Sequence, residues 1–238
     1  MQRYFGNVLN LDVSLTEDDA FHITKVMRAK EGDQIEVVDS GKVFLCKIKN
    51  IKPLRIEVEK ELKEDHELGN KVILICGLLK GEKIDFVLQK ATELGVYEIV
   101  FFNSERTIVK FNPSQKESKY ERFQKILKEA SEQSKRTNIP LLNKLIDFKD
   151  IGKLKLDRKY IAYECFKGKA NLIKELAKAK DGQVIGIVIG PEGGFSEKEY
   201  EFAKEKGFKP VTLGKRILRA ETAAIYSLSV ISAVLENK

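Results

Sequence analysis

The sequence predicts an α/β protein with a largely parallel sheet, preceded by a small β-rich domain. From Lys71 onward, apolar runs of strand length alternate with segments of helical period, as in parallel α/β sheets. Before residue 70, short strand-like segments follow one another closely, which is typical of a small barrel. The polar stretch Lys63–Asn70 ends in turn residues, so we place the boundary there and expect domains at 1–69 and 70–238.

The first domain is expected to contain one short helix and several strands. Thr16, with Asp19 three positions later, can cap a helix that runs to about Met27. Ser40-Gly41 suits a hairpin turn between two of the strands. The expected strands are Gln34–Asp39, Val43–Lys49 and Leu54–Lys60.

The second domain is expected to alternate strands and helices to the end of the chain. The expected strands are Val72–Leu79, Val96–Phe102, Tyr160–Tyr163, Val184–Ile189 and Val211–Leu213. Helices are expected over Glu82–Leu94, after a capping box of Ser114 and Glu117, over Leu172–Ala179, after Ser196 with Glu199, and at the end of the chain.

The charge of the chain is unevenly distributed. The net charge is +7, yet residues 1–70 hold 11 basic against 14 acidic side chains, and residues 71–238 hold 32 against 22. A basic second part favours a polyanionic partner, with nucleic acid the first candidate. A lysine-rich solvated surface would give the same charge, so composition alone does not choose between the two.

Composition also argues against several classes of protein. The three cysteines, Cys46, Cys76 and Cys165, are far apart and odd in number, which indicates a reducing compartment without disulfides. Only His22 and His66 offer imidazoles, so a Cys/His metal site lacks ligands. The N-terminus does not read as a signal peptide, and no apolar run approaches the roughly 20 residues that span a bilayer. We therefore expect a cytoplasmic protein.

Two glycine-bearing turns, Ile189–Ser196 and Leu213–Ala223, carry the strongest functional signal. Each follows a short apolar run and opens a segment of helical period. Turns of this kind after neighbouring parallel strands place a ligand pocket at the carboxyl edge of the sheet. Neither turn matches the dinucleotide fingerprint or the phosphate loop, so the sequence indicates a small-molecule site of another kind.

The second turn brings charged and polar side chains together. Arg219, Glu221 and Thr222 offer a charge pair and a hydroxyl group for orienting a polar substrate. The alternative is a surface ion pair with a capping hydroxyl, which contributes little to stability. We expect Ile217 and Leu218, which precede Arg219, to be buried.

Basic residues outside the turns are candidates for contacts with RNA phosphates. Arg106 and the Lys135-Arg136 pair fall in or beside expected loops. His22 and Arg28 offer a second such group in the first domain, although a histidine there is more often structural.

Several stretches, taken together, carry a resemblance to a known family. They are His22-Ile23 with Val26 and Arg28, Lys80–Lys83, Gln89–Val96, Ser104–Thr107, Glu129-Ala130 with Glu132-Gln133, Ile189–Ser196 and Leu213–Ala223. These stretches resemble the RsmE family, the 16S rRNA (uridine N3) methyltransferases of the SPOUT superfamily. The resemblance runs nearly end to end, and the last two stretches are its most specific part.

The resemblance implies a PUA-like RNA-binding barrel and a SPOUT methyltransferase domain with a trefoil knot at about residues 160–225. Chain connections are otherwise almost never knotted, so only the resemblance suggests the knot. It further implies a homodimer, 16S rRNA in the small ribosomal subunit as partner, and S-adenosylmethionine as methyl donor without a metal.

The resemblance also implies roles for particular residues. Catalysis would involve Arg219, Glu221 and Thr222, and RNA binding His22, Arg28, Arg106, Lys135 and Arg136. The cofactor would contact Glu164, Cys165, Ile189, Gly190, Pro191, Glu192, Gly193, Gly194, Leu213, Gly214, Ile217, Leu218, Arg219, Thr222 and Ala223.

Three other functions are alternatives to the one that the resemblance implies. A methyltransferase of the same superfamily with another RNA target or another methylated atom would share these turns. A non-catalytic RNA-binding protein would need only the barrel and the basic surface. A nucleotide hydrolase would need a phosphate loop, a metal-binding carboxylate cluster or a nucleophile–histidine pair, and none is evident.

Overall fold

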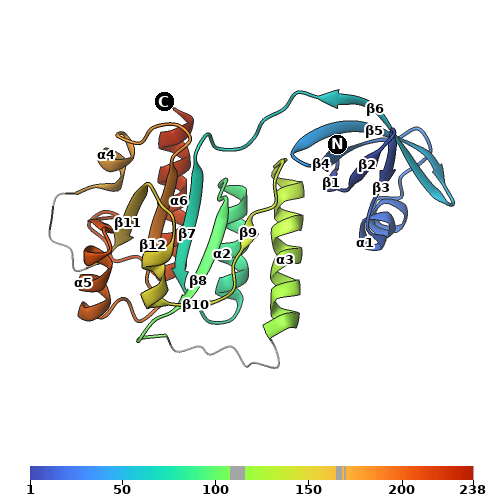
Figure 1. The fold of residues 1–238 in the computed structure, drawn as a ribbon. Helices are drawn as coiled ribbons and strands as arrows, with labels where there is room; N and C mark the ends of the chain where they lie inside the picture. Colours follow the sequence, from blue (N-terminus) through green and yellow to red (C-terminus); the bar gives the residue numbers. More distant parts are fainter. Residues whose placement is uncertain (108–115, 165–167, 169, 238) are drawn as a thin grey trace. The chain divides into compact units, whose positions relative to one another are not determined.

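The computed structural model describes residues 1–107, 116–164, 168 and 170–237 (Figure 1). The chain forms two compact units. One unit consists of Met1–Glu67 with Lys128–Ile139, and the other of Leu68–Leu127 with Pro140–Lys238. The first segment of the N-terminal unit ends at Glu67, and the sequence places the domain boundary after residue 69. The inclusion of Lys128–Ile139 in the N-terminal unit was not expected.

The N-terminal unit is built on a six-stranded sheet in the order β1-β4-β5-β6-β3-β2. Its strands are β1 (Arg3–Phe5), β2 (Asn7–Leu9), β3 (Asp12–Ser14), β4 (Gln34–Asp39), β5 (Lys42–Ile51) and β6 (Leu54–Leu62). The two edge strands β1 and β2 are joined by Gly6 alone, so the sheet must curl until its edges are neighbours. A Cβ at Gly6 would lie 2.6 Å from a methyl of Leu15, which explains the glycine at this closure.

The expected helix after Thr16 is present but changes type along its length. Thr16 accepts a hydrogen bond from the backbone N–H of Asp19 at 3.2 Å and caps α1 (Glu17–Phe21). The continuation over His22–Val26 is π-helical rather than α-helical. Ile23 from this turn packs into the barrel core with Tyr4 and Val37.

The C-terminal unit contains a parallel sheet in the order β10-β8-β7-β12-β11-β13, with β9 paired to β8. Every strand pair described in this sheet is parallel. The strands are β7 (Lys71–Gly77), β8 (Glu98–Asn103), β9 (Leu141–Leu142), β10 (Ile146–Asp147), β11 (Arg158–Ala162), β12 (Val184–Ile189) and β13 (Lys209–Val211). This arrangement confirms the expected parallel α/β sheet.

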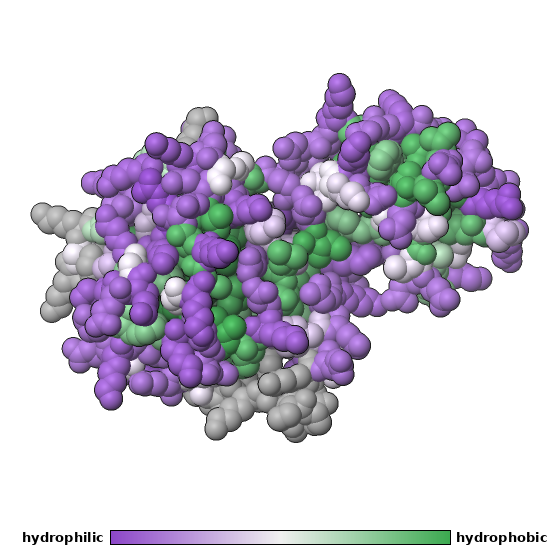
Figure 2. All heavy atoms as spheres, in the orientation of Figure 1, coloured by the Kyte–Doolittle hydropathy of each residue, from purple (hydrophilic) through white to green (hydrophobic). Residues whose placement is uncertain are grey.

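Helices cover both faces of this sheet. The helices of this unit are α2 (Glu82–Glu93), α4 (Leu172–Leu176), α5 (Glu197–Glu205) and α6 (Ala220–Glu236), with a 3₁₀ helix over Phe148–Lys153. Helix α3 (Lys116–Gln133) has residues in both units. Helix α6 contacts β7, β12, α2 and α4. Helix α5 packs with the 3₁₀ helix against the core that contains Ile73 and Ile75, which alternate along β7 with the equally buried Val72 and Leu74. On the face drawn in Figure 2, hydrophilic residues cover most of this unit.

The position of the site follows from the order of three strands. Strands β12, β11 and β13 are neighbours and parallel, so their last residues, Ile189, Ala162 and Val211, lie at one edge of the sheet. Both glycine-bearing turns begin at this edge, as expected. Strand pairing does not define the threading of the chain, and the knot stays a prediction.

Candidate active site

Two adjoining hollows lie at this carboxyl edge. Their volumes are about 110 Å³ and 320 Å³, and the larger falls within the range of about 300–1,000 Å³ usual for small-molecule pockets. Both are lined by Ala162, Glu164, Ile217, Leu218 and Ala223. The shared lining makes them two parts of one cleft, which we call the carboxyl-edge cleft.

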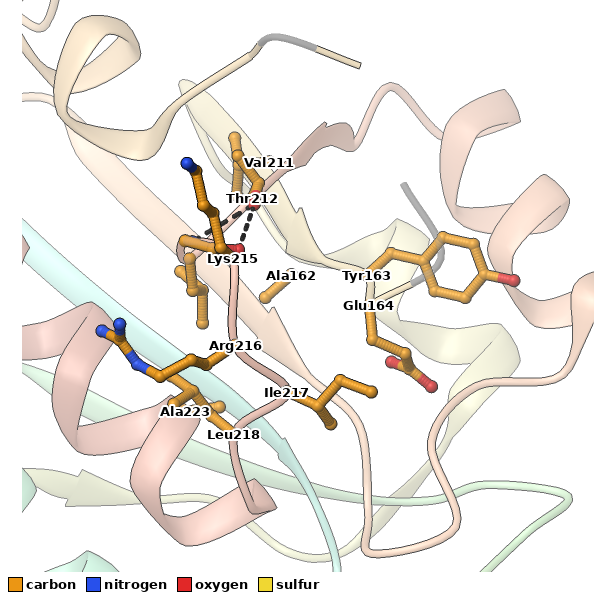
Figure 3. Close-up of a pocket in the computed structure, with 12 residues that line it drawn as sticks. Ala162, Tyr163, Glu164, Val211, Thr212, Lys215, Arg216, Ile217, Leu218 and Ala223 are labelled. Carbon is orange, nitrogen blue, oxygen red and sulfur yellow. Dashed lines mark hydrogen bonds between the residues drawn. The ribbon is translucent and has the colours of Figure 1, made fainter. Parts of the chain in front are cut away.

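The smaller hollow is formed by the segment that follows β13 (Figure 3). The hydroxyl of Thr212 accepts a hydrogen bond from the N–H of Gly214 at 3.2 Å and donates one to the Gly214 carbonyl at 3.1 Å. Gly214 has φ of +116°, a conformation that favours glycine. In Figure 3, Ile217 and Glu164 extend toward one another, while the ring of Tyr163 points away from them.

The expectation that Ile217 is buried is wrong, because the residue is 86% exposed. The residue belongs to an irregular segment, and it lines both hollows without a layer of protein over it. Leu218 beside it is half-buried. An apolar side chain open to a cleft suits contact with the apolar part of a ligand.

The glycine-rich turn after β12 forms the wall of the larger hollow. Gly194 has φ of +66°, and a Cβ there would collide with the carboxylate of Glu164. At Gly193, a Cβ would lie 2.9 Å from the Cβ of Arg106. The close approach of neighbouring atoms explains these glycines. The approaching atoms belong to the protein itself rather than to a ligand.

Buried polar groups fix this turn against the loop after β8. Glu199 accepts hydrogen bonds from the N–H of Ser196 at 2.9 Å and from the N–H of Glu105 at 3.0 Å. The Ser196 hydroxyl accepts from the Glu199 N–H at 3.2 Å, which completes the expected capping box of α5. Arg106 donates to the Gly193 carbonyl at 3.2 Å.

A charge cluster lies beside the larger hollow and joins three segments of the chain. The Lys83 ammonium, in the first turn of α2, is 3.2 Å from Oε1 of Glu192 and 3.5 Å from Oε2 of Glu221. The backbone N–H of Lys80 also donates to Glu192 Oε1, at 3.1 Å. Burial raises the pKa of Glu192, but the backbone N–H groups of Glu192 and Lys80 and the Lys83 ammonium lower it below its usual value overall.

Of the three residues expected to be catalytic, Arg219 lines the cleft, whereas Glu221 and Thr222 line neither hollow. Arg219 is exposed and lines the larger hollow, just before α6. Glu221, in the first turn of α6, is paired with Lys83 and its side chain is 14% exposed. Thr222 is exposed and lines neither hollow.

Most of the residues expected to contact a cofactor do line the cleft. These are Glu164, Ile189, Gly190, Pro191, Glu192, Gly194, Leu213, Gly214, Ile217, Leu218, Arg219 and Ala223. Gly193 and Thr222 do not, and Cys165 lies outside the described residues.

Other lining residues had no expected role in the sequence. They are Lys83, Ala162, Tyr163, Val211, Thr212, Lys215, Arg216 and Ala220. Lys83 could have been found, because it belongs to the Lys80–Lys83 stretch that contributes to the family resemblance.

The residues expected to bind RNA have different environments. Arg28 and Arg106 are exposed, and His22 Nδ1 is 2.9 Å from the Tyr4 hydroxyl. Lys135 pairs with Glu36 at 2.7 Å. The side chain of Arg136 is 3% exposed and pairs with Glu67. A guanidinium so deeply buried serves the fold of its own unit.

The described residues include neither a metal-binding cluster nor a membrane-spanning helix. Within residues 1–107, 116–164, 168 and 170–237, no group of three or more His, Cys, Asp or Glu side chains is placed to hold a metal ion. No helix in the same part of the chain has the length and apolar character needed to cross a membrane.

Family models match both units of the chain. Residues 66–232 match the RNA methyltransferase domain, and residues 15–61 match the RNA methyltransferase PUA domain. A similar protein is the ribosomal RNA small subunit methyltransferase E of Bacillus subtilis, which is 35% identical over 98% of this chain and 96% of that protein.

Solved structures are similar over nearly the whole chain. A ribosomal RNA small subunit methyltransferase E from Neisseria gonorrhoeae, bound to S-adenosyl methionine, has a TM-score of 0.85 and 30% identity, covering 98% of this chain and 97% of the other. A methyltransferase from Legionella pneumophila, in complex with the cofactor SAM, has a TM-score of 0.86 and 29% identity with the same coverage.

Proposed function

The chain belongs to the RNA methyltransferase family, with the ribosomal RNA small subunit methyltransferases E among its relatives, and we propose that it methylates N3 of a uridine in 16S rRNA. It is an RNA methyltransferase, and S-adenosylmethionine is its methyl donor. The observation that carries the proposal is the carboxyl-edge cleft, built from the two glycine-bearing turns that the sequence marks as a ligand site.

The residues of the cleft fit this donor. S-adenosylmethionine combines an apolar and aromatic adenosine part with a charged amino-acid part and a sulfonium centre. Ile217 and Leu218 offer apolar contacts in both hollows. Glu164 and Glu192 offer charges to the polar part of the molecule. Backbone groups near Leu213 and Leu218 are our candidates for holding the adenine.

When bound, S-adenosylmethionine supplies a methyl group carried on an electron-poor sulfonium centre. The uridine N3 bears a proton and is a poor nucleophile until that proton leaves. We assign its acceptance to Glu221 or to water, and we assign Arg219 to stabilising the negative charge that develops on the uracil carbonyl oxygens. Thr222 would orient the base. Most of the acceleration should come from holding N3 in line with the methyl group.

The RNA partner and the assembly belong to the same proposal. We propose that residues 1–69 form the RNA-binding PUA-like domain and residues 70–238 the methyltransferase domain, with a knot at about 160–225. Arg28 and Arg106, both exposed, are our candidates for phosphate contacts, with His22 beside Arg28 in sequence. We leave out Lys135 and Arg136 because both pair with carboxylates. A homodimer acting on the small subunit in the cytoplasm completes the proposal.

The decisive experiment uses small ribosomal subunits from a strain that lacks the gene. The protein and S-adenosylmethionine are added, and the nucleosides of the 16S rRNA are analysed by mass spectrometry. We expect one new 3-methyluridine. A different methylated nucleoside would overturn the assigned atom, and methylation of another RNA alone would overturn the assigned target.

Replacing Arg219 tests the assigned chemistry. We expect Arg219→Ala to lower turnover by about 100-fold or more, as for other donors that stabilise developing charge. The Kd of the donor, measured by calorimetry, should change by less than about threefold, because Arg219 acts on the base. Full turnover in this variant would remove the assignment.

A further inference from the structure

Lys83 lies between two carboxylates that come from distant parts of the chain. Glu192 belongs to the glycine-rich turn after β12, and Glu221 to the first turn of α6. Their oxygens are 3.2 Å and 3.5 Å from the Lys83 ammonium. One ammonium therefore connects α2, the turn and α6 at the wall of the larger hollow.

The two carboxylates of this cluster are partly shielded from water, which strengthens the effect of their charges. The Glu221 and Glu192 side chains are 14% and 25% exposed. Among the described residues, Glu221 Oε2 is buried without a hydrogen-bond donor, and its contact with Lys83 is an ion pair without hydrogen-bond geometry. Lys83 is thus the cation that compensates both carboxylates, and the cluster retains one net negative charge.

We propose that Lys83 is a positioning residue whose ammonium, by pairing with Glu192 and Glu221, sets the charge of the cleft wall and thereby its preference for the sulfonium donor over the thioether product. The inference rests on the proposed function. Methyl transfer forms a bond from N3 to the methyl carbon and returns the electrons of the sulfur–carbon bond to sulfur. The donor therefore carries one positive charge more than the product. A more negative wall binds the donor more tightly relative to the product, so the charge of Lys83 sets this preference.

The experiment measures the Kd of S-adenosylmethionine and of S-adenosylhomocysteine by calorimetry at pH 8. The ratio of product Kd to donor Kd isolates the sulfonium charge, because the adenosine, amino and carboxylate groups are common to both ligands. We expect Lys83→Met to raise this ratio by about threefold to tenfold and Glu192→Gln to lower it by a similar factor. Lys83→Arg should retain the wild-type ratio, since it keeps the charge.

A matched control comes from the same helix. Lys90 pairs with Glu93 at 2.8 Å on α2 and lines neither hollow. Lys90→Met therefore removes an ion pair without changing the charge of the cleft wall. Its ratio should equal that of the wild type. Melting temperatures report on the folding of each variant, and Glu192→Gln, which keeps the shape of its side chain, provides the test if Lys83→Met does not fold.

The outcomes distinguish failure of the role assigned to Lys83 from failure of the proposed function. Shifts of opposite sign in Lys83→Met and Glu192→Gln support the role of Lys83. Unchanged ratios in folded variants that bind both ligands overturn that role and leave the proposed function standing. Failure of the wild-type protein to bind either ligand overturns the proposed function itself.

Discussion

At Gly194, the backbone conformation favours glycine, and a Cβ would displace the end of a neighbouring side chain. Its φ is +66°, and a Cβ would collide with the Glu164 carboxylate, which lines both hollows. We expect Gly194→Ala to weaken donor binding by about tenfold or more, because Glu164 and the turn must both shift. Gly182→Ala is the control, since Gly182 has φ of +76° and open space around it. Calorimetry gives the Kd, and equal losses in both variants would contradict the spatial argument.

The ionisation of Glu192 makes a prediction about pH. Burial raises the pKa of Glu192, but backbone N–H groups and Lys83 lower it below the usual 4.5 overall in the folded protein. A carboxyl group of this kind stabilises the fold above its unfolded pKa, and the contribution is lost as pH falls through the folded pKa. We expect Glu192→Gln to lower the melting temperature at pH 7 and to lower it much less near pH 3.5. A pH-independent difference would show that ionisation of Glu192 contributes nothing to stability.

The glycines and Arg219 are predictable from the sequence, because glycine-rich turns and charges after strands are local patterns. The role of Lys83 is not, because its partner Glu192 is 109 positions away along the chain. The exposure of Ile217 is not predictable either, because hydrophobicity alone does not show whether a cleft or a core surrounds a side chain.

Among the elements, helix starts were more predictable than helix ends. Thr16 and Ser196 cap helices as expected, because a cap depends on residues three positions apart. Ser114, expected to cap α3, lies outside the described residues. Helix α4 ends at Leu176 rather than Ala179, and the strand expected over Val211–Leu213 is Lys209–Val211. These ends depend on tertiary packing, which no short sequence window records.

The N-terminus of α5 gives a prediction at this scale. Glu199 is buried and accepts hydrogen bonds from Ser196 and from Glu105 in another loop. We expect Glu199→Gln to destabilise the protein by about 1–2 kcal/mol, since the charge-assisted bonds weaken and an amide NH₂ faces a backbone N–H. The melting temperature should fall by roughly 2–8 °C. The control is Glu197→Gln, which changes an exposed carboxylate in the same helical turn. Equal shifts in the two variants would refute the role of the hydrogen bonds.

At the scale of the whole molecule, the sequence predicts one boundary between two domains. In the structure, the chain returns to the N-terminal unit, because the segment Lys128–Ile139 belongs to that unit. Composition and periodicity do not show this return, because it depends on contacts between residues more than a hundred positions apart. Charged side chains make several of those contacts. Lys128, for example, pairs with Asp19 at 2.6 Å.

Arg3 provides the test of this return segment. Its fully buried guanidinium pairs with Glu36 at 2.8 Å and Glu64 at 2.6 Å, and it donates to the backbone carbonyls of Lys135 and Arg136. We expect Arg3→Met to destabilise the N-terminal unit by about 3–5 kcal/mol, because it leaves the buried Glu36 carboxylate and two backbone carbonyls without this donor. Hydrogen exchange measured by mass spectrometry should accelerate in peptides covering 128–139 and stay unchanged in peptides covering 197–205.

A surface ion pair of the same unit serves as the control for Arg3. Lys42 and Glu61 are 3.5 Å apart and both well exposed, so Lys42→Met should change stability by less than about 0.5 kcal/mol and leave the exchange pattern intact. If Arg3→Met left exchange at 128–139 at the wild-type rate, the segment would be held by its apolar contacts alone. Buried charge would then explain neither the return of the chain nor the burial of Arg136, whereas accelerated exchange confined to 128–139 and its barrel neighbours would identify Arg3 as the group that retains the segment.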